Sequence, residues 1–204
     1  NGCDSTVTTN LTILPQLTVS IQSIGNATVC TGSSANLSMA GFASSTNTYQ
    51  WADANGNISG ATSSTYTTTM SGSYTLTIVD ANGCSATSSA VVVTVITPTT
   101  PTGLSTSSIQ LDQATMNWAT VTNTNHYDIR MRVQGSTWSV AINSIPASFT
   151  AKTKTGLSSS TTYEWQIRSA CSNDSSSVSA WSSTQSFTTL TPCTVPTNPT
   201  TAGI

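Results

Sequence analysis

The sequence predicts an all-β protein made of tandem antiparallel β-sandwiches. Three observations predict this fold class. Apolar and polar residues alternate along short segments, Gly-containing turn pairs separate those segments, and a sustained helical period of apolar residues is absent. Ser and Thr make up more than a third of the chain, and both are weak helix formers. A length of 204 residues leaves room for two domains of about 100 residues each.

Five segments carry the alternation that places apolar side chains on one face of a strand. In chain order they are Tyr49/Trp51, Tyr74/Leu76/Ile78, Val91/Val93/Val95, Tyr127/Ile129/Met131/Val133 and Tyr163/Trp165/Ile167. The turn signals that punctuate them are Asn55-Gly56, Ser71-Gly72, Asn82-Gly83 and Gln134-Gly135. At Asn82-Gly83 we expect a type I′ hairpin turn, because this pair tolerates the positive φ angles that the turn needs.

Charge and composition exclude several classes of function. Only 6% of the residues are charged and the formal net charge is −2, which provides no basic surface for nucleic acid. No apolar run reaches the roughly 20 residues of a membrane-spanning helix, so no membrane insertion is expected. Five cysteines without CxxC spacing favour an oxidising, extracellular compartment over a zinc site, and no cofactor is expected.

Internal repeats predict that the chain is a window cut from a longer array. The tripeptide Asn-Gly-Cys opens the chain and returns at residues 82–84, each time followed by a Ser/Thr-rich run and an apolar run. The Thr/Pro-rich segments around Pro101 and Pro196 are also similar. We therefore expect residues 1–15 to supply the last strand, Val7–Leu14, of a preceding repeat. Two complete domains at 16–97 and 98–190 should follow, and then a linker and the start of a further repeat at 191–204.

Residues 16–97 resemble an immunoglobulin-like domain. Trp51 stands where the core tryptophan of the third strand is expected, and the segment Ser71–Leu76 is similar to the tyrosine-corner motif, with Tyr74 as the corner residue. The two positions of the usual inter-sheet cysteines fall near Met39 and at Leu76, so that disulfide is not expected. By the same resemblance, residues 1–15 belong to an immunoglobulin-like repeat.

Residues 98–190 resemble a fibronectin type III domain over their whole length. Pro101–Leu104 opens the domain, Trp118 matches the tryptophan of the second strand, and Leu157 precedes the corner residue Tyr163 by six positions. Phe187–Thr189 closes it. Residues 191–204 are then the linker and the start of a following fibronectin type III repeat.

Four motifs together look like repeats of large secreted surface proteins of Bacteroidota: Asn-Gly-Cys, residues 163–171 (YEWQIRSAC), residues 179–182 (SAWS) and residues 187–193 (FTTLTPC). That resemblance implies a cell-surface adhesin, in some cases one of gliding motility, that is exported by type IX secretion. It implies a non-catalytic stalk whose partners are neighbouring domains of the same long chain. Secretion machinery and a surface glycan or protein ligand are further candidate partners. The alternatives are a spacer or carbohydrate-binding accessory module of a secreted enzyme, and a receptor ectodomain.

The cysteines and one serine are the candidate modification sites. Cys30 and Cys84 are expected at the same pole of the first sandwich, which predicts a Cys30–Cys84 disulfide. Cys3, Cys171 and Cys193 are expected to lack partners within this chain, with an interdomain or intermolecular bond at Cys171 as the alternative. The triplet Asp4-Ser5-Thr6 fits an O-glycosylation site that the Bacteroidota resemblance implies, so Ser5 is a candidate.

No catalytic residue or metal ligand is expected. The single histidine, His126, is predicted to point to solvent from the strand that holds Tyr127. The polar segments 53–57 and 80–83 carry one carboxylate each and are interpreted as hairpin turns, because a calcium site needs more. Asp128 and Glu164 are predicted to form exposed salt bridges with Arg130, Arg132 and Arg168. The alternative is a ladder of guanidinium groups stacked near Trp181.

Overall fold

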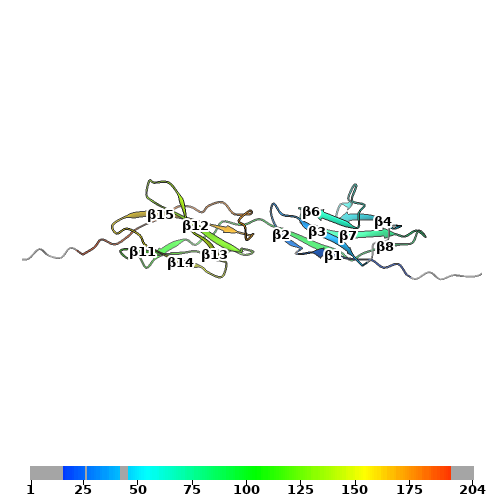
Figure 1. Cartoon of the computed structure of the whole chain (residues 1–204), viewed down its shortest axis with the longest axis horizontal. Helices are drawn as coiled ribbons and strands as arrows, with labels where there is room; N and C mark the ends of the chain where they lie inside the picture. Colours follow the sequence, from blue (N-terminus) through cyan, green and yellow to red (C-terminus); the bar gives the residue numbers. More distant parts are fainter. Residues whose placement is uncertain (1–15, 26, 42–45, 194–204) are drawn as a thin grey trace, which may run out of the picture. The chain divides into compact units, whose positions relative to one another are not determined.

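The computed structural model describes residues 16–25, 27–41 and 46–193. Within these ranges all the regular secondary structure consists of β-strands (Figure 1). The chain separates into two compact units. The first contains the described residues up to Thr28 and those within Ser34–Thr94, and the second contains Val29–Ser33 and the described residues from Val95 onward. Cys3, Ser5 and the expected strand Val7–Leu14 lie outside the described residues.

The described residues therefore include no helix that could span a membrane.

Two antiparallel sheets account for the strands up to residue 96. One has the order β1-β3-β6, and the other has the order β2-β9-β7-β4-β5 with β8 paired to β7. The strands of the first sheet are β1 (Ser20–Ile24), β3 (Ala35–Ala40) and β6 (Thr65–Thr68). Those of the second are β2 (Thr28–Cys30), β4 (Thr48–Asp53), β5 (Gly56–Asn57), β7 (Gly72–Val79), β8 (Ser85–Thr87) and β9 (Val91–Ile96).

Alternation along β4 and β7 builds the core of the first unit. Along β7, Tyr74, Leu76 and Ile78 are buried while the residues between them are more exposed. Trp51 of β4 is fully buried, and its indole N–H donates to the Ser63 carbonyl at 2.8 Å. The Tyr74 hydroxyl donates to the Met70 carbonyl at 3.0 Å. This bond closes the tyrosine corner that the sequence predicted.

The second unit contains a three-stranded and a four-stranded antiparallel sheet, with the orders β10-β11-β14 and β13-β12-β15-β16. The strands are β10 (Ser105–Ser107), β11 (Gln113–Asn117), β12 (His126–Val133), β13 (Ser139–Pro146), β14 (Ala151–Thr155), β15 (Thr162–Ala170) and β16 (Gln185–Thr188). One face of each sheet contributes to a single buried cluster, which gives a sandwich.

The core of the second unit contains the residues that carried the fibronectin type III resemblance. Trp118 packs edge-on against Tyr127, with ring centroids 5.3 Å apart, and Trp165 is fully buried. Leu157 and Tyr163 belong to the same cluster, and the Tyr163 hydroxyl accepts the Ser158 backbone N–H at 2.9 Å. The predicted fold class, tandem antiparallel β-sandwiches of immunoglobulin-like and fibronectin type III-like type, is confirmed.

The turn at Asn82-Gly83 differs from the expected type I′ geometry. Gly83 has φ +81°, but Asn82 is not among the residues with positive φ. The Gly83 N–H donates to the Asp80 carbonyl and the Asp80 N–H to the Cys84 carbonyl, so the loop has three residues. A three-residue loop of this kind needs only its last residue in the left-handed region, which glycine adopts without strain.

Candidate functional site

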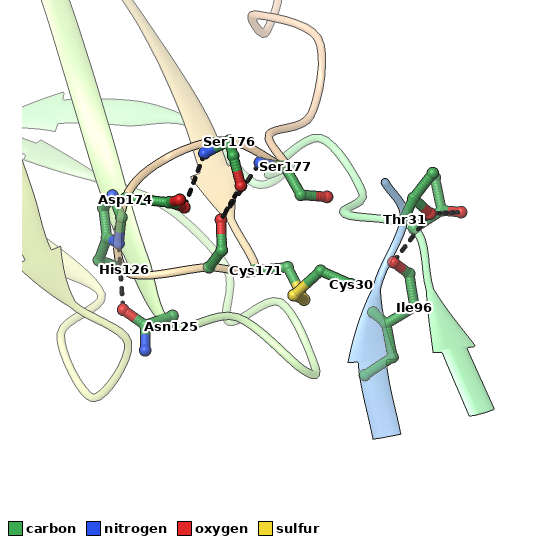
Figure 2. The surroundings of a disulfide bond; sticks show 11 residues. Cys30, Thr31, Ile96, Asn125, His126, Cys171, Asp174, Ser176 and Ser177 are labelled. Atoms are coloured by element: carbon green, nitrogen blue, oxygen red, sulfur yellow. Dashed lines mark hydrogen bonds between the residues drawn. A yellow bond between two sulfur atoms is a disulfide. The ribbon is translucent and has the colours of Figure 1, made fainter. Parts of the chain in front are cut away.

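A disulfide bond joins Cys30, the last residue of β2, to Cys171, the residue that follows β15 (Figure 2). Their Cα atoms are 5.9 Å apart, within the range that a disulfide requires. The predicted Cys30–Cys84 bond is therefore wrong, and so is the prediction that Cys171 lacks a partner. Cys84 and Cys193 are exposed free thiols.

The register of the sheet explains why Cys84 does not meet Cys30. β7 and β9 are antiparallel, and Gly72, the first residue of β7, lies opposite the middle of β9. Thr31, next to Cys30, donates its backbone N–H to the carbonyl of Ile96 at the end of β9 (2.8 Å). Cys84 instead follows the far end of β7, and the length of that strand separates the two ends by about 23 Å.

A short loop, residues 171–177, follows the disulfide and is closed by its own hydrogen bonds. The Cys171 backbone N–H donates to the Ser177 carbonyl at 3.0 Å, and the Ser177 N–H donates to the Ser172 hydroxyl at 3.2 Å. The Ser176 N–H donates to the Asp174 carboxylate at 3.0 Å (Figure 2). The loop therefore holds Cys171 in place.

Asp174 should report on this loop by its titration. The hydrogen bond from the Ser176 backbone N–H, followed by those from the Ser172 and Ser176 hydroxyls, lowers the pKa of Asp174 to about 2. Because the folded-state pKa lies below the ordinary value of 3.8, the contribution to stability is present above pH 3.8 and is lost as the pH falls through about 2. We expect the carboxyl ¹³C shift of Asp174 to titrate near pH 2, and Ser172→Ala to raise that midpoint. A midpoint at or above 3.8 in the unchanged protein contradicts the loop geometry.

His126 is buried, contrary to the prediction that it points to solvent. Its side chain is enclosed because the 171–177 loop covers the start of β12, and only 4% of the residue is exposed. Nε2 lies 3.0 Å from the Ser175 hydroxyl, and Nδ1 lies 3.1 Å from Oδ1 of Asn125. Nε2 is also 3.6 Å from the Asp128 carboxylate. The imidazole thus connects the loop to β12.

Asp128 is also buried rather than exposed, with 2% of its surface accessible. The pairing of β12 with β13 is irregular on either side of Ile129, and Ser144 of β13 has φ +52°. This irregularity brings the Ser144 backbone N–H to 3.1 Å from one carboxylate oxygen of Asp128. Arg168 donates to the other oxygen at 3.1 Å. Hydrogen bonds and an ion pair therefore satisfy this buried charge.

Five side chains form what we call the Trp–Arg ladder: Arg132, Trp138, Arg130, Trp181 and Arg168, in that order. Arg132 and Arg130 lie over Trp138, with guanidinium carbons 4.3 and 4.8 Å from the ring centroid. Arg130 and Arg168 both lie 4.6 Å from the centroid of Trp181. The stacking that the sequence offered as an alternative near Trp181 is confirmed, and Trp138 is an additional rung that sequence reasoning missed.

The register of β12 and β15 sets the polar partners of the ladder. Arg132 lies opposite Glu164 and Arg130 opposite Gln166. The guanidinium Nε atoms of the two arginines donate to these side chains, each at 2.6 Å. Burial lowers the pKa of Arg130, and the charges of Arg132 and Arg168 lower it further. The predicted salt bridges of Asp128 and Glu164 therefore exist, as part of the ladder.

Two serines flank Trp181 and fasten its segment to β15. The Ser179 hydroxyl accepts the Ser169 backbone N–H, and the Ser182 hydroxyl accepts the Ile167 backbone N–H, both at 3.1 Å. The same two serines donate their own backbone N–H groups to the carbonyls of Ser169 and Ile167 at 2.9 Å. The SAWS motif thus acts as an irregular edge strand that positions the Trp181 ring over the arginines.

An open hollow of about 420 Å³ lies beside the ladder, over β12, β13 and the end of β14. Arg132 and Lys154 line it together with hydroxyl groups and the apolar side chains of Met131 and Leu157. No carboxylate is among its lining residues, so the hollow offers no pair of carboxylates for acid–base chemistry.

The two aspartate turns serve their own backbones. Asp53 accepts the Asn55 N–H at 2.7 Å, and Asp80 accepts the N–H groups of Asn82 and Cys84, both at 2.9 Å. These hydrogen bonds define each turn as an Asx turn. The part of the chain that the structure describes contains no group of three or more His, Cys, Asp or Glu placed to hold a metal ion.

Comparisons with known proteins place the chain among β-sandwich structures. No protein-family model matches it. Domains A168–A170 of titin superpose with a TM-score of 0.57 at 14% identity, over 85% of this chain and 66% of that chain. A two-domain fibronectin type III segment of chicken tenascin gives a TM-score of 0.43 at 17% identity, over 76% of this chain and 92% of that chain. The titin likeness is one of fold.

A curated relative offers a partial sequence match. A poly(3-hydroxybutyrate) depolymerase of Delftia acidovorans is 34% identical over 73 residues, which is 36% of this chain. This chain covers 14% of the depolymerase. The match therefore concerns a small part of that enzyme.

Proposed function

We propose that this chain is a non-catalytic structural stalk segment of a long extracellular adhesin or surface filament protein. One observation carries the proposal. The side chains best suited to chemistry, His126, Asp128, Glu164 and the ladder arginines, are engaged in contacts that hold strands and a loop together. Such contacts support a sandwich that serves as a rigid spacer.

The proposal includes the setting of the protein. A disulfide together with low charge supports a secreted or surface protein, because such bonds persist in oxidising compartments. In its finer form, residues 16–97 and 98–190 are repeats of a Bacteroidota adhesin exported by type IX secretion, with a role such as gliding motility. Its partners are then the neighbouring domains of the same chain.

Deletion of the codons for residues 16–190 from the source gene tests this role. We expect the shortened protein to be exported and displayed, and we expect cells to attach less firmly because the binding region stands closer to the surface. Immunogold labelling of intact cells with antibodies against the present chain should mark the cell exterior. Labelling confined to the cytoplasm contradicts the proposal.

The Ser175–His126 contact allows a direct test of the non-catalytic assignment. A serine hydrogen-bonded to a histidine is the first requirement of a serine hydrolase, but this imidazole is enclosed, and its Nε2 also lies 3.6 Å from the Asp128 carboxylate. We expect no covalent labelling of Ser175 by a fluorophosphonate probe, measured by mass spectrometry of the intact chain. A trypsin sample serves as the positive control. Labelling at Ser175 that disappears in His126→Ala contradicts the assignment.

The second candidate is a spacer or accessory module of a secreted enzyme, which the partial match to the depolymerase favours. Co-sedimentation with poly(3-hydroxybutyrate) granules, with cellulose and with chitin distinguishes the candidates. A stalk should stay in the supernatant with all three. Saturable binding to one polymer favours the accessory module.

A further inference from the structure

We infer that the Cys30–Cys171 bond is a covalent strap that removes residues 31–170 from the path of a force applied along the chain. The two cysteines are 141 positions apart, and their sulfur atoms are directly bonded. A pull on the segments before Cys30 and after Cys171 is therefore transmitted through the bridge. The polypeptide between the two cysteines forms a closed loop that carries no tension while the bond is intact.

The loop encloses nearly all of the strands. It contains β3 to β15, and with them the central strands β7, β12 and β15 and the core tryptophans Trp51 and Trp165. Among the strands that the structure describes, β1, β2 and β16 lie on the loaded path. β1 pairs with β3, β2 with β9, and β16 with β15. Tension can peel these three strands from their neighbours, but it cannot draw out the enclosed strands.

Hydrogen bonds hold the backbone at both ends of the strap (Figure 2). Next to Cys30, the backbone N–H and the hydroxyl of Thr31 donate to the Ile96 carbonyl at 2.8 and 3.0 Å. At the other end, the Cys171 N–H donates to Ser177 within the closed 171–177 loop, which His126 contacts through Ser175. Cys30 is thus held next to Ile96, which lies within the covalent loop, whereas Cys171 is held by Ser177, which lies on the loaded path.

The biological use of the strap rests on the proposed mechanical role, but its physical effect can be measured separately. An intact bond between Cys30 and Cys171 prevents the enclosed residues from extending, whatever it adds to the stability of the fold. The released length therefore measures directly how much of the chain the bond takes out of the loaded path.

Single-molecule force spectroscopy on the full 204-residue chain, held by marker domains at both termini, tests the inference. The oxidised chain should release about 500 Å less than the reduced chain, since each extended residue spans about 3.5 Å and the cysteines are 141 positions apart. The double variant Cys30→Ser/Cys171→Ser should behave like the reduced chain. Cys84→Ser removes an exposed free thiol and should match the oxidised protein.

Reduction of the unchanged protein during the pulling experiment covers the case in which the double variant does not fold. Equal released lengths in the oxidised and reduced chains overturn the inference, as does non-reducing peptide mapping that finds no Cys30–Cys171 peptide. The stalk proposal is tested by labelling of cells, so the two can fail separately. If the oxidised chain releases the shorter length but the protein is absent from the cell surface, the inference about the disulfide holds and the stalk proposal is rejected.

Discussion

Replacing Trp51 with alanine should lower the free energy of unfolding of the first unit by about 4 kcal/mol. The side chain is fully buried, and its ring stacks on Tyr66 with centroids 5.7 Å apart. Truncation removes this contact, leaves a large cavity between the sheets, and deprives the Ser63 carbonyl of the indole N–H that it accepts at 2.8 Å. The combined loss places the variant among the most destabilising single substitutions in the chain.

Guanidinium denaturation followed by circular dichroism measures this loss. Val92→Ala is a matched control, because Val92 lies in β9 of the same sheet and is 62% exposed. The control should change stability by less than about 0.5 kcal/mol. A loss below about 1.5 kcal/mol for Trp51→Ala contradicts the central position of this tryptophan.

The sandwich fold could be predicted because strand alternation and burial follow the same period. Tyr74, Leu76 and Ile78 are buried in β7, and Tyr163, Trp165 and Ile167 are buried in β15, as their spacing indicated. The hydroxyl of each corner tyrosine forms a hydrogen bond with the backbone, which the motif also indicated. These features depend on residues that are close together in the sequence, so they can be recognised in a single sequence.

The disulfide could not be predicted from the same information. A cysteine finds its partner through the whole tertiary structure, and alternation does not say which strand ends meet. The sequence favours Cys84 as the partner of Cys30, because both are expected at one pole of the first sandwich. The antiparallel pairing of β7 with β9 instead places Cys84 at the opposite end of the sheet from Thr31 and Ile96.

The alternation in β12 predicts an exposed face for His126 and Asp128, and this prediction fails for a related reason. Period-two alternation distinguishes the two faces of a strand, but it does not indicate that a loop or a bulge covers the second face. The 171–177 loop encloses His126, and the β12–β13 irregularity encloses Asp128. Trp138 precedes β13 and stacks on two arginines of β12. The sequence carried a signal for this contact, because Trp138 follows the Gln134-Gly135 turn directly after a strand with arginines at alternating positions.

The Trp–Arg ladder should contribute strongly to the stability of the second unit. Trp181→Ala removes the ring that separates Arg130 from Arg168, together with two cation–π contacts. Each such contact is worth about 0.5 to 2 kcal/mol, depending on how far it is shielded from water. We expect the free energy of unfolding to fall by about 3 kcal/mol. Trp181→Phe retains an aromatic face and should lose less than half of that amount.

A double-mutant cycle separates the stacking from simple loss of packing. Arg130→Met keeps an apolar stem under the ring but removes the charge, so the cycle with Trp181→Ala isolates the guanidinium–indole term. We expect a coupling free energy of about 1 kcal/mol, measured by guanidinium denaturation. The coupling should persist at high salt, because the indole rings on either side of the guanidinium group shield it from dissolved ions. A coupling near zero would show that the rings and arginines share a surface without stabilising each other, and the rigidity of the second unit would then rest on its core alone.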